Sequence, residues 1–333
     1  MERHQVALYL AALGAGAAVG LLVPAVARPA GAAVTPVLGL LLYATFLSVP
    51  FRRLGTAVRH VRFLLTVLVL NFAVVPAVAF VLSRLVARDE VLALGVLFVL
   101  LTPCVDYVLA FTGLAGGAQE RLLAATPLLM LAQMVLLPGY LWLLAGERFA
   151  SGLDPAPFRE AFVVLIVVPL AAAWLTQAAA GRWAWARTLD RVASAGMVPL
   201  MMATLAVVVA SQAYDVGHHL GGLLAVVPLY VLFALVMVVA GLAAGRIAGL
   251  DGAGRRAVVF SGVTRNSLVV LPLVLAVPAA LGPRFGLVPL VVVTQTLVEL
   301  VVMVVLVRVV PHLVSAPGRS PRAPSVTGPP GPA

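Results

Sequence analysis

The sequence predicts an all-α membrane protein with ten transmembrane helices in two inverted five-helix repeats, helices four and nine being discontinuous and crossing at mid-membrane. Three observations predict this fold. Of 333 residues, 63% are hydrophobic and 10% are charged, with a mean hydropathy of +1.13, whereas a soluble domain is about 25% charged. Ten apolar segments follow one another along the chain. The two halves also share an internal repeat, described below.

Each apolar segment approaches the roughly 20 residues that a membrane-spanning helix needs. Ala25-Val26-Ala27 resembles a signal-peptide cleavage site, but the apolar run before it is long and nine more follow, so we expect the first helix to be retained. Residues 1–150 would form the first repeat and 151–314 the second. The tail, 315–333, is rich in Pro, Gly and Ser and is predicted to be disordered. The ten segments cover residues 5–27, 34–50, 61–86, 91–117, 122–145, 158–180, 190–212, 221–248, 256–281 and 286–312.

The basic residues orient this bundle. All 22 are arginines, and fifteen of them fall on the same side as the N-terminus against six on the opposite side. By the positive-inside rule, both termini are predicted to face the cytoplasm. The net charge of +10 is therefore explained by topology and not by nucleic-acid binding. One cysteine, and five histidines at segment ends or in loops, give no disulfide or metal pattern, so no cofactor is predicted.

The internal repeat appears when the sequence is shifted by 162 residues without gaps. Five predicted spans separate each residue from its equivalent; this odd number inverts the second half relative to the first. Inverted repeats with interrupted helices at corresponding positions are typical of secondary transporters. The matches include Thr102 with Thr264, Pro127 with Pro289 and Gln133 with Gln295.

The fourth segment is interrupted by Thr102-Pro103-Cys104-Val105-Asp106-Tyr107. Proline removes a helical hydrogen bond, and such a break is tolerated at bilayer depth only where the freed backbone groups face protein or a watery cavity. An acid in a span costs about 2.5–3.5 kcal/mol and by default marks a functional site. The equivalent stretch, Val263-Thr264-Arg265-Asn266-Ser267, has four consecutive polar residues and predicts a second break, with Asn266 equivalent to Cys104.

Charged residues inside the spans are few. An intramembrane arginine needs a partner, and of the 12 acidic residues only Asp106 and Glu299 lie deep in spans. We expect Arg265 to pair with one of them. Glu299 shares a helix face with Gln295, four residues earlier, while the equivalent face of the fifth span has Gln133 without an acid. Glu299 is thus predicted to carry a coupling proton or cation.

At these residues the chain resembles the bile acid:sodium symporter superfamily and, within it, the arsenical-resistance efflux permeases. Their fourth span carries Ala-Pro-Cys-Thr, and this chain has Thr102-Pro103-Cys104-Val105; their tenth carries Leu-Val-Glu, as do Leu297-Val298-Glu299. The resemblance covers about residues 5–312. It implies extrusion of arsenite or antimonite across the plasma (cell inner) membrane by proton antiport, with Cys104 contacting the metalloid and Glu299 carrying the coupling charge.

The chain also departs from those permeases. Their ninth span carries Asn-Asn-Phe-Glu, whereas here Asn266 is followed by Ser267-Leu268-Val269 and no acid. Arg265, together with half-helix N-termini pointing inward, would suit an anionic substrate. A sodium-coupled symporter of a small organic or inorganic anion therefore remains the alternative. Hard oxygen ligands suit Na⁺, whereas a thiolate suits a soft centre; the candidate oxygen donors are Thr102, Asp106, Asn266, Ser267 and Gln295.

An intramembrane hydrolase would need two catalytic acids, a Ser–His pair or a metal site. Deep in the spans lie one Asp, one distant Glu and no His, so a transporter and not an enzyme is predicted. Its partners would be a small inorganic or organic substrate, H⁺ or Na⁺, and the lipid bilayer; its oligomeric state and direction of transport stay open. The predicted substrate-binding residues are Cys104, Arg265, Asn266 and Ser267, and the predicted coupling residues are Thr102, Asp106, Gln133, Gln295 and Glu299.

Overall fold

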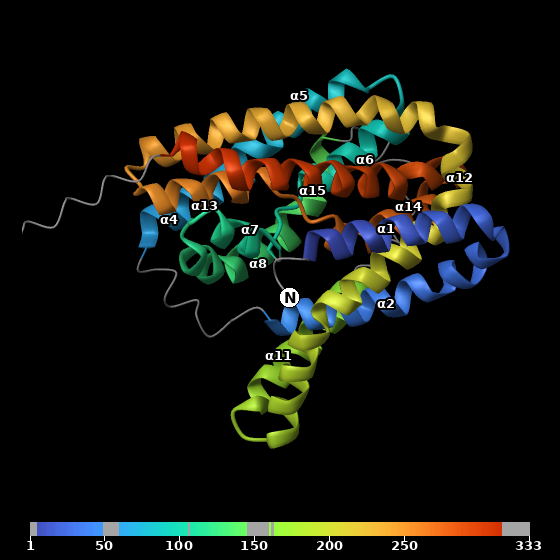
Figure 1. Cartoon of the computed structure of the whole chain (residues 1–333), viewed down its shortest axis with the longest axis horizontal. Helices are drawn as coiled ribbons and strands as arrows, with labels where there is room; N and C mark the ends of the chain where they lie inside the picture. The colour runs from blue at the N-terminus through green and yellow to red at the C-terminus, as the bar shows by residue number, and fades with distance from the viewer. Residues whose placement is uncertain (1–4, 49–59, 106, 145–159, 161–162, 315–333) are drawn as a thin grey trace, which may run out of the picture.

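The computed structural model describes residues 5–48, 60–105, 107–144, 160 and 163–314, which are almost entirely helical (Figure 1). Within these residues, five helices are long and apolar enough to cross a membrane, and a sixth is added if the bent start of α12 counts as one span. The chain is thus a multi-pass helical membrane protein. The five helices cover Pro29–Leu47, Val61–Leu85, Gln119–Leu144, Leu223–Ile247 and Phe285–Leu313.

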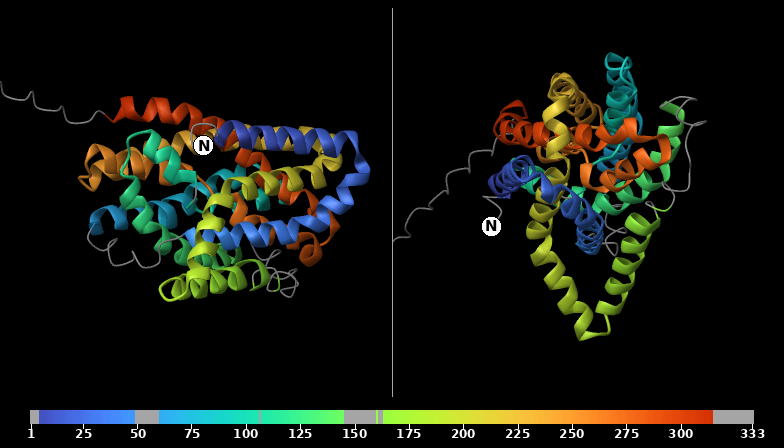
Figure 2. Two further views of the ribbon diagram at one scale, coloured as in Figure 1. Left: turned by 60° about the horizontal axis from the view of Figure 1, so that its bottom comes forward. Right: turned by 90° about the vertical axis from the view of Figure 1, so that its right-hand side faces the viewer.

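The first two helices form a hairpin. α1 (Gln5–Leu22) and α2 (Ala27–Ser48) are joined by the short η2 (Pro24–Val26), and both pack against α12 (Ala184–Ile247), part of which runs between them in the left view of Figure 2. The sequence pattern places the start of the second helix at residue 34, but α2 begins seven residues earlier. Pro29 does not prevent this, because proline is tolerated in the first helical turn, where its missing N–H has no intrahelical partner.

The third predicted span contains a π-helical turn. α4 (Val61–Val69) leads into η5 (Leu70–Val74) and then α5 (Val75–Leu85). Pro76 cannot donate to the carbonyl of Phe72, four residues earlier, and the Tyr140 hydroxyl donates to that carbonyl instead. The same order recurs in η6 (Val163–Val167), which precedes Pro169 in α11 (Val168–Ala180). The turn in η5 carries Asn71, which belongs to the candidate site described below.

α12 (Ala184–Ile247) is helical throughout. The sequence pattern predicts two helices with a loop over 213–220, and this prediction is wrong for the backbone, which stays helical there. The helix is not straight: it bends by 52° between Ala184–Ala193 and Val198–Ser211, where Pro199 disrupts the backbone ladder. It turns sharply again near its middle (Figure 1), so its two halves still run in different directions. α11 and the start of α12 project from the bundle as a hairpin (Figure 2).

The remaining helices hold the two interruptions. The fourth predicted span is divided into α6 (Glu90–Leu100) and α7 (Tyr107–Leu114), and the ninth into α13 (Gly252–Val263) and α14 (Ser267–Leu281). α8 (Gln119–Leu144) follows the first broken pair, while η7 (Pro283–Leu287) and α15 (Val288–Leu313) follow the second. Asp106 and the tail, 315–333, lie outside the described residues. The number of ten spans and the boundaries of the two repeats remain predictions.

A salt bridge joins the outer ends of α8 and α13. The Arg121 guanidinium donates to both carboxylate oxygens of Asp251, each at 2.9 Å. Asp251 also caps α13 by accepting from the N–H of Gly254 at 2.8 Å. The hydrogen bond from Arg121 lowers the pKa of Asp251 below its ordinary value. This bridge helps to anchor the second broken helix to α8.

Asp251→Asn should lower stability by about 0.2–1 kcal/mol near neutral pH, as is typical of a solvent-exposed pair. Asparagine still caps the helix, so the change isolates the ionic contribution. Because the folded-state pKa is the lower one, this contribution is present above the unfolded-state pKa and is lost as the pH falls through the folded-state pKa. Melting temperatures of the two proteins, compared from neutral to acidic pH, should therefore converge. A difference that stays constant with pH would contradict this account.

Candidate functional site

The two helix breaks contact each other directly. Pro103 and Arg265 face each other in an antiparallel bridge. The N–H of Cys104 donates to the Thr264 carbonyl at 3.2 Å, and the N–H of Asn266 donates to the Thr102 carbonyl at 2.7 Å. A buried backbone group without a partner costs about as much as a lost hydrogen bond. Each break therefore satisfies backbone groups that the other leaves exposed.

The hydrogen bonds at the crossing are related by the 162-residue offset. Residues 104 and 264 form the first interbreak bond, and their equivalents, 266 and 102, form the second. The Thr102 hydroxyl donates to the Phe98 carbonyl at 3.0 Å, and the equivalent Thr264 hydroxyl donates to the Phe260 carbonyl at 2.8 Å. The two breaks are thus built in the same way, although their sequences share few residues.

A buried carboxylate lies against the second break. Glu299 of α15 is 4% exposed. Its Oε2 accepts from the backbone N–H of Arg265 at 2.8 Å and from the Gln295 side chain one turn earlier. Its Oε1 accepts from the Tyr107 hydroxyl at 2.6 Å, and that hydroxyl also lies 2.9 Å from the Arg265 carbonyl. Glu299 consequently links α15 to both broken helices.

The Arg265 guanidinium is fully buried on the other side of its backbone. Among the described residues, no side-chain ion pair joins Arg265 to Glu299. Asp106, the other acid expected to pair with it, lies outside the described residues, so the pairing of Arg265 with one of these two acids stays a prediction. Instead the guanidinium donates to four uncharged oxygens and lies 5.6 Å from the Phe233 ring centroid. These acceptors are Asn71 Oδ1 at 2.7 Å and the carbonyls of Ser261 (2.8 Å), Gly262 (2.9 Å) and Leu100 (3.2 Å).

Several predicted site residues keep buried polar atoms without a hydrogen-bond partner. Asn266 Oδ1 caps α14 by accepting from the N–H of Val269 at 3.1 Å, but its Nδ2 is unpaired. Gln295 Oε1 and both polar side-chain atoms of Gln133 are likewise unpaired among the described residues. Such groups are few in folded proteins, and each requires an explanation, such as an ion, a water or a ligand.

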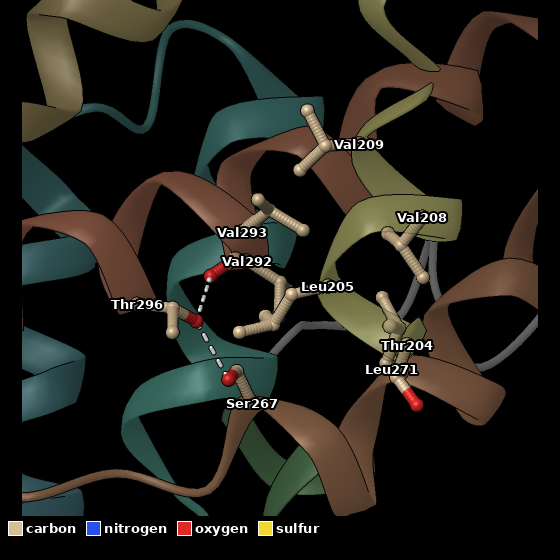
Figure 3. Close-up of a pocket in the computed structure, with 9 residues that line it drawn as sticks. All are labelled: Thr204, Leu205, Val208, Val209, Ser267, Leu271, Val292, Val293 and Thr296. Carbon is tan, nitrogen blue, oxygen red and sulfur yellow. Dashed lines mark hydrogen bonds between the residues drawn. The ribbon is translucent and has the colours of Figure 1, made fainter. Parts of the chain in front are cut away.

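A small cleft opens beside the second break (Figure 3). Ser267 and Thr296 form its polar edge, where the Thr296 hydroxyl donates to Ser267 Oγ at 2.6 Å. Cys104, Arg265 and Glu299 are buried and do not line it. The cleft has room for little more than a water molecule, and most of its lining is aliphatic. Its lining residues come from α12, α14 and α15: Thr204, Leu205, Val208, Val209, Ser267, Leu271, Val292, Val293 and Thr296.

The site includes residues to which the sequence analysis assigns no role in it. Tyr107 is the last residue of the first broken stretch. Its partner, Glu299, is 192 residues away in sequence, so no local sequence pattern indicates this contact. Asn71 is a lone polar residue in an apolar span, which is the pattern expected of a helix–helix contact. The structure brings Asn71 to the Arg265 guanidinium and to Ser261 Oγ, at 2.9 Å.

Residues 35–219 match the model of the sodium bile acid symporter family. This is more than half of the chain, and it includes the first break. The second break and Glu299 lie beyond the matched region. No curated protein matches the chain. Closer likeness to the arsenical-resistance permeases remains a prediction. The helical membrane architecture and the extent of the match agree, and the chain belongs to the sodium bile acid symporter family.

Proposed function

We propose that the chain is a secondary active transporter that moves a small organic anion across the membrane together with a coupling cation. The substrate site would lie where the two broken helices meet. The observation that carries this proposal is the set of unpaired buried polar atoms there, on Asn266 and Gln295. A small cleft lined mainly by aliphatic side chains lies beside this place.

Glu299 is proposed as the coupling residue. It accepts from the backbone N–H of Arg265 in the second break and from the Tyr107 hydroxyl at the end of the first break. A change in the charge of Glu299 therefore acts on both breaks. The Tyr107 hydroxyl has a single hydrogen but two acceptors, Glu299 Oε1 and the Arg265 carbonyl. A proton on Glu299 would let both contacts form fully. The family's name points to sodium as the other candidate cation.

The proposed architecture is two inverted five-helix repeats in the plasma membrane, with both termini cytoplasmic. The two backbone hydrogen bonds at the crossing support the inverted repeat. The first half donates in one of them, from Cys104 to Thr264, and the second half donates in the equivalent one, from Asn266 to Thr102. Discontinuous helices at a repeat interface form the substrate and ion sites of many secondary transporters. Thr102, Ser267 and Gln133 would then belong to the lining of the transport path.

Metalloid extrusion by proton antiport is the second candidate. The observation that favours it is the position of Cys104 in the bridge between the two breaks. Two observations weigh against it as the first choice. The thiol is fully buried and does not line the cleft, and the described residues contain no group of three His, Cys, Asp or Glu that could hold a metal ion.

One stabilisation screen separates the two candidates. Ligand that binds only the folded state raises the melting temperature, so wild type would be heated with arsenite and with carboxylates and sulfonates of increasing apolar size, bile acids included. We expect an anion to stabilise wild type and to lose that effect in Asn266→Ala. Thr66→Ala is the control, since the Thr66 hydroxyl donates within its own helix, to the Arg62 carbonyl.

Two results would overturn the first proposal. If arsenite stabilises wild type and Cys104→Ser abolishes the effect while no anion acts, the chain is a metalloid exporter. If anions stabilise Asn266→Ala as strongly as wild type, the substrate site is not at the crossing.

A further inference from the structure

The Arg265 guanidinium lies in a cage of oxygen atoms. Three oxygens converge on one atom, Nη2: Asn71 Oδ1 at 2.7 Å, the Ser261 carbonyl at 2.8 Å and the Gly262 carbonyl at 2.9 Å. A fourth, the Leu100 carbonyl, is 3.2 Å from Nη1. The entire side chain is buried. Among the described residues, no carboxylate oxygen accepts from this guanidinium, and all four acceptors are uncharged oxygens.

Nη2 faces more acceptors than its hydrogens can serve one by one. An NH₂ group has two hydrogens, but three oxygens lie within 2.9 Å of Nη2. Nε, in contrast, has no partner among the described residues. The N–H groups of Arg265 therefore do not match the oxygens around them: Nη2 has too many acceptors and Nε has none among the described residues. A spherical cation has no such limit, because it attracts every oxygen around it equally, and hard cations prefer carbonyl and amide oxygens.

The C-terminal ends of two broken helices, which are the negative ends of their helix dipoles, also point towards the Arg265 guanidinium. Leu100 is the last residue of α6, and Ser261 and Gly262 lie in the last turn of α13. A helix C-terminus carries about half a negative charge. In transporters with discontinuous helices, such C-terminal ends and unwound carbonyls coordinate coupling cations. The oxygen cage is thus the kind of site where a transporter would hold a monovalent cation.

We propose that Arg265 is a tethered cation that permanently fills this place. A sodium ion does not fit beside Nη2, and the guanidinium supplies the positive charge that joins the ends of α6 and α13 without any bound ion. The inference rests on the proposed function, cation-coupled transport, and limits it. This chain takes up no sodium at the oxygen cage, and its coupling cation acts elsewhere, at Glu299.

The test removes the Arg265 side chain from the oxygen cage and measures whether sodium then stabilises the protein. Arg265→Ala would be purified in detergent and heated in sodium chloride or in choline chloride of equal ionic strength. We expect sodium to raise its melting temperature by about 2–4 °C more than it raises that of wild type, once sodium is well above its dissociation constant. Adding Asn71→Leu to this variant should remove the extra rise, because one of the three converging oxygens is lost.

Arg256→Ala is the matched control. Arg256 also binds main-chain carbonyls, of Ala115, Gly116, Pro311 and Val314, but no more than two at either nitrogen, and it is partly exposed. It should gain no sodium response. Guanidinium chloride at low millimolar concentration is a second probe, since the free ion should restore the melting temperature of Arg265→Ala towards that of wild type.

An equal sodium response in wild type and Arg265→Ala would overturn the proposal, as would an extra response that survives Asn71→Leu. If Arg265→Ala is too unstable to heat, the yield of monodisperse protein decides: it should be higher when cells are lysed and the protein is purified in sodium than in choline, and an equal yield contradicts the proposal. These readouts measure cation binding and not transport. A chain that moves no anion would refute the proposed function and leave this result standing.

Discussion

Glu299→Gln is expected to abolish accumulation of substrate against its gradient while leaving exchange across the membrane intact. Glutamine has the size of the carboxylate and can still accept the Arg265 N–H, but it can neither bind nor release a coupling cation. Without coupling, steady-state accumulation cannot exceed the ratio that the membrane potential alone allows. The variant should therefore lose all uphill transport.

The measurement is uptake into proteoliposomes under an imposed sodium or proton gradient, together with counterflow of labelled substrate at zero gradient. The gradient-driven overshoot should disappear in Glu299→Gln, and counterflow should persist. Glu120→Gln is the control, since Glu120 is an exposed acid in the first turn of α8. An overshoot of wild-type size in Glu299→Gln would remove this residue from the coupling mechanism.

Gly95→Val should prevent α6 from packing against α15. A Cβ atom at Gly95 would lie 2.7 Å from both Cβ and Cγ1 of Val291, a distance that real contacts do not reach. Val291 is fully buried and β-branched, so it has little freedom to move aside. Overpacking of this kind costs about 1–3 kcal/mol, and here it would also displace the helix that carries Glu299.

The folded fraction and the melting temperature of the purified variant check this prediction. Gly139→Val is the matched control: it changes the same residue type within a helix, but a Cβ there meets nothing within 4 Å. We expect Gly139→Val to behave as wild type. Equal melting temperatures for the two variants would show that α6 and α15 are farther apart or more adaptable than described here.

The positions of the two helix breaks could be read from the sequence because their causes are local. Pro103 removes a backbone donor, and the polar run at 264–267 cannot face lipid. The contact between them was also predictable in outline, since the repeat makes residues 102–104 equivalent to 264–266. These local rules say which residues leave the helix, and the repeat says which of them correspond.

The partner of Arg265 could not be predicted in the same way. A buried arginine in a sequence suggests an acidic partner. Among the described residues, however, the guanidinium donates to three main-chain carbonyls and to Asn71. Carbonyl positions depend on where helices end in space, and no residue type marks them. The continuous α12 has a similar explanation, because a polar stretch at 213–220 reads as a loop unless the path of the backbone is known.

The central claim is that this chain performs uphill, cation-coupled transport through the crossing of its broken helices. The most direct test is the uptake of a labelled stabilising anion by wild-type proteoliposomes under three conditions: a sodium gradient, a proton gradient and no gradient. The account predicts transient accumulation above equilibrium under at least one gradient, abolished by the ionophore that dissipates it. Uptake that only equilibrates under all three conditions would contradict it.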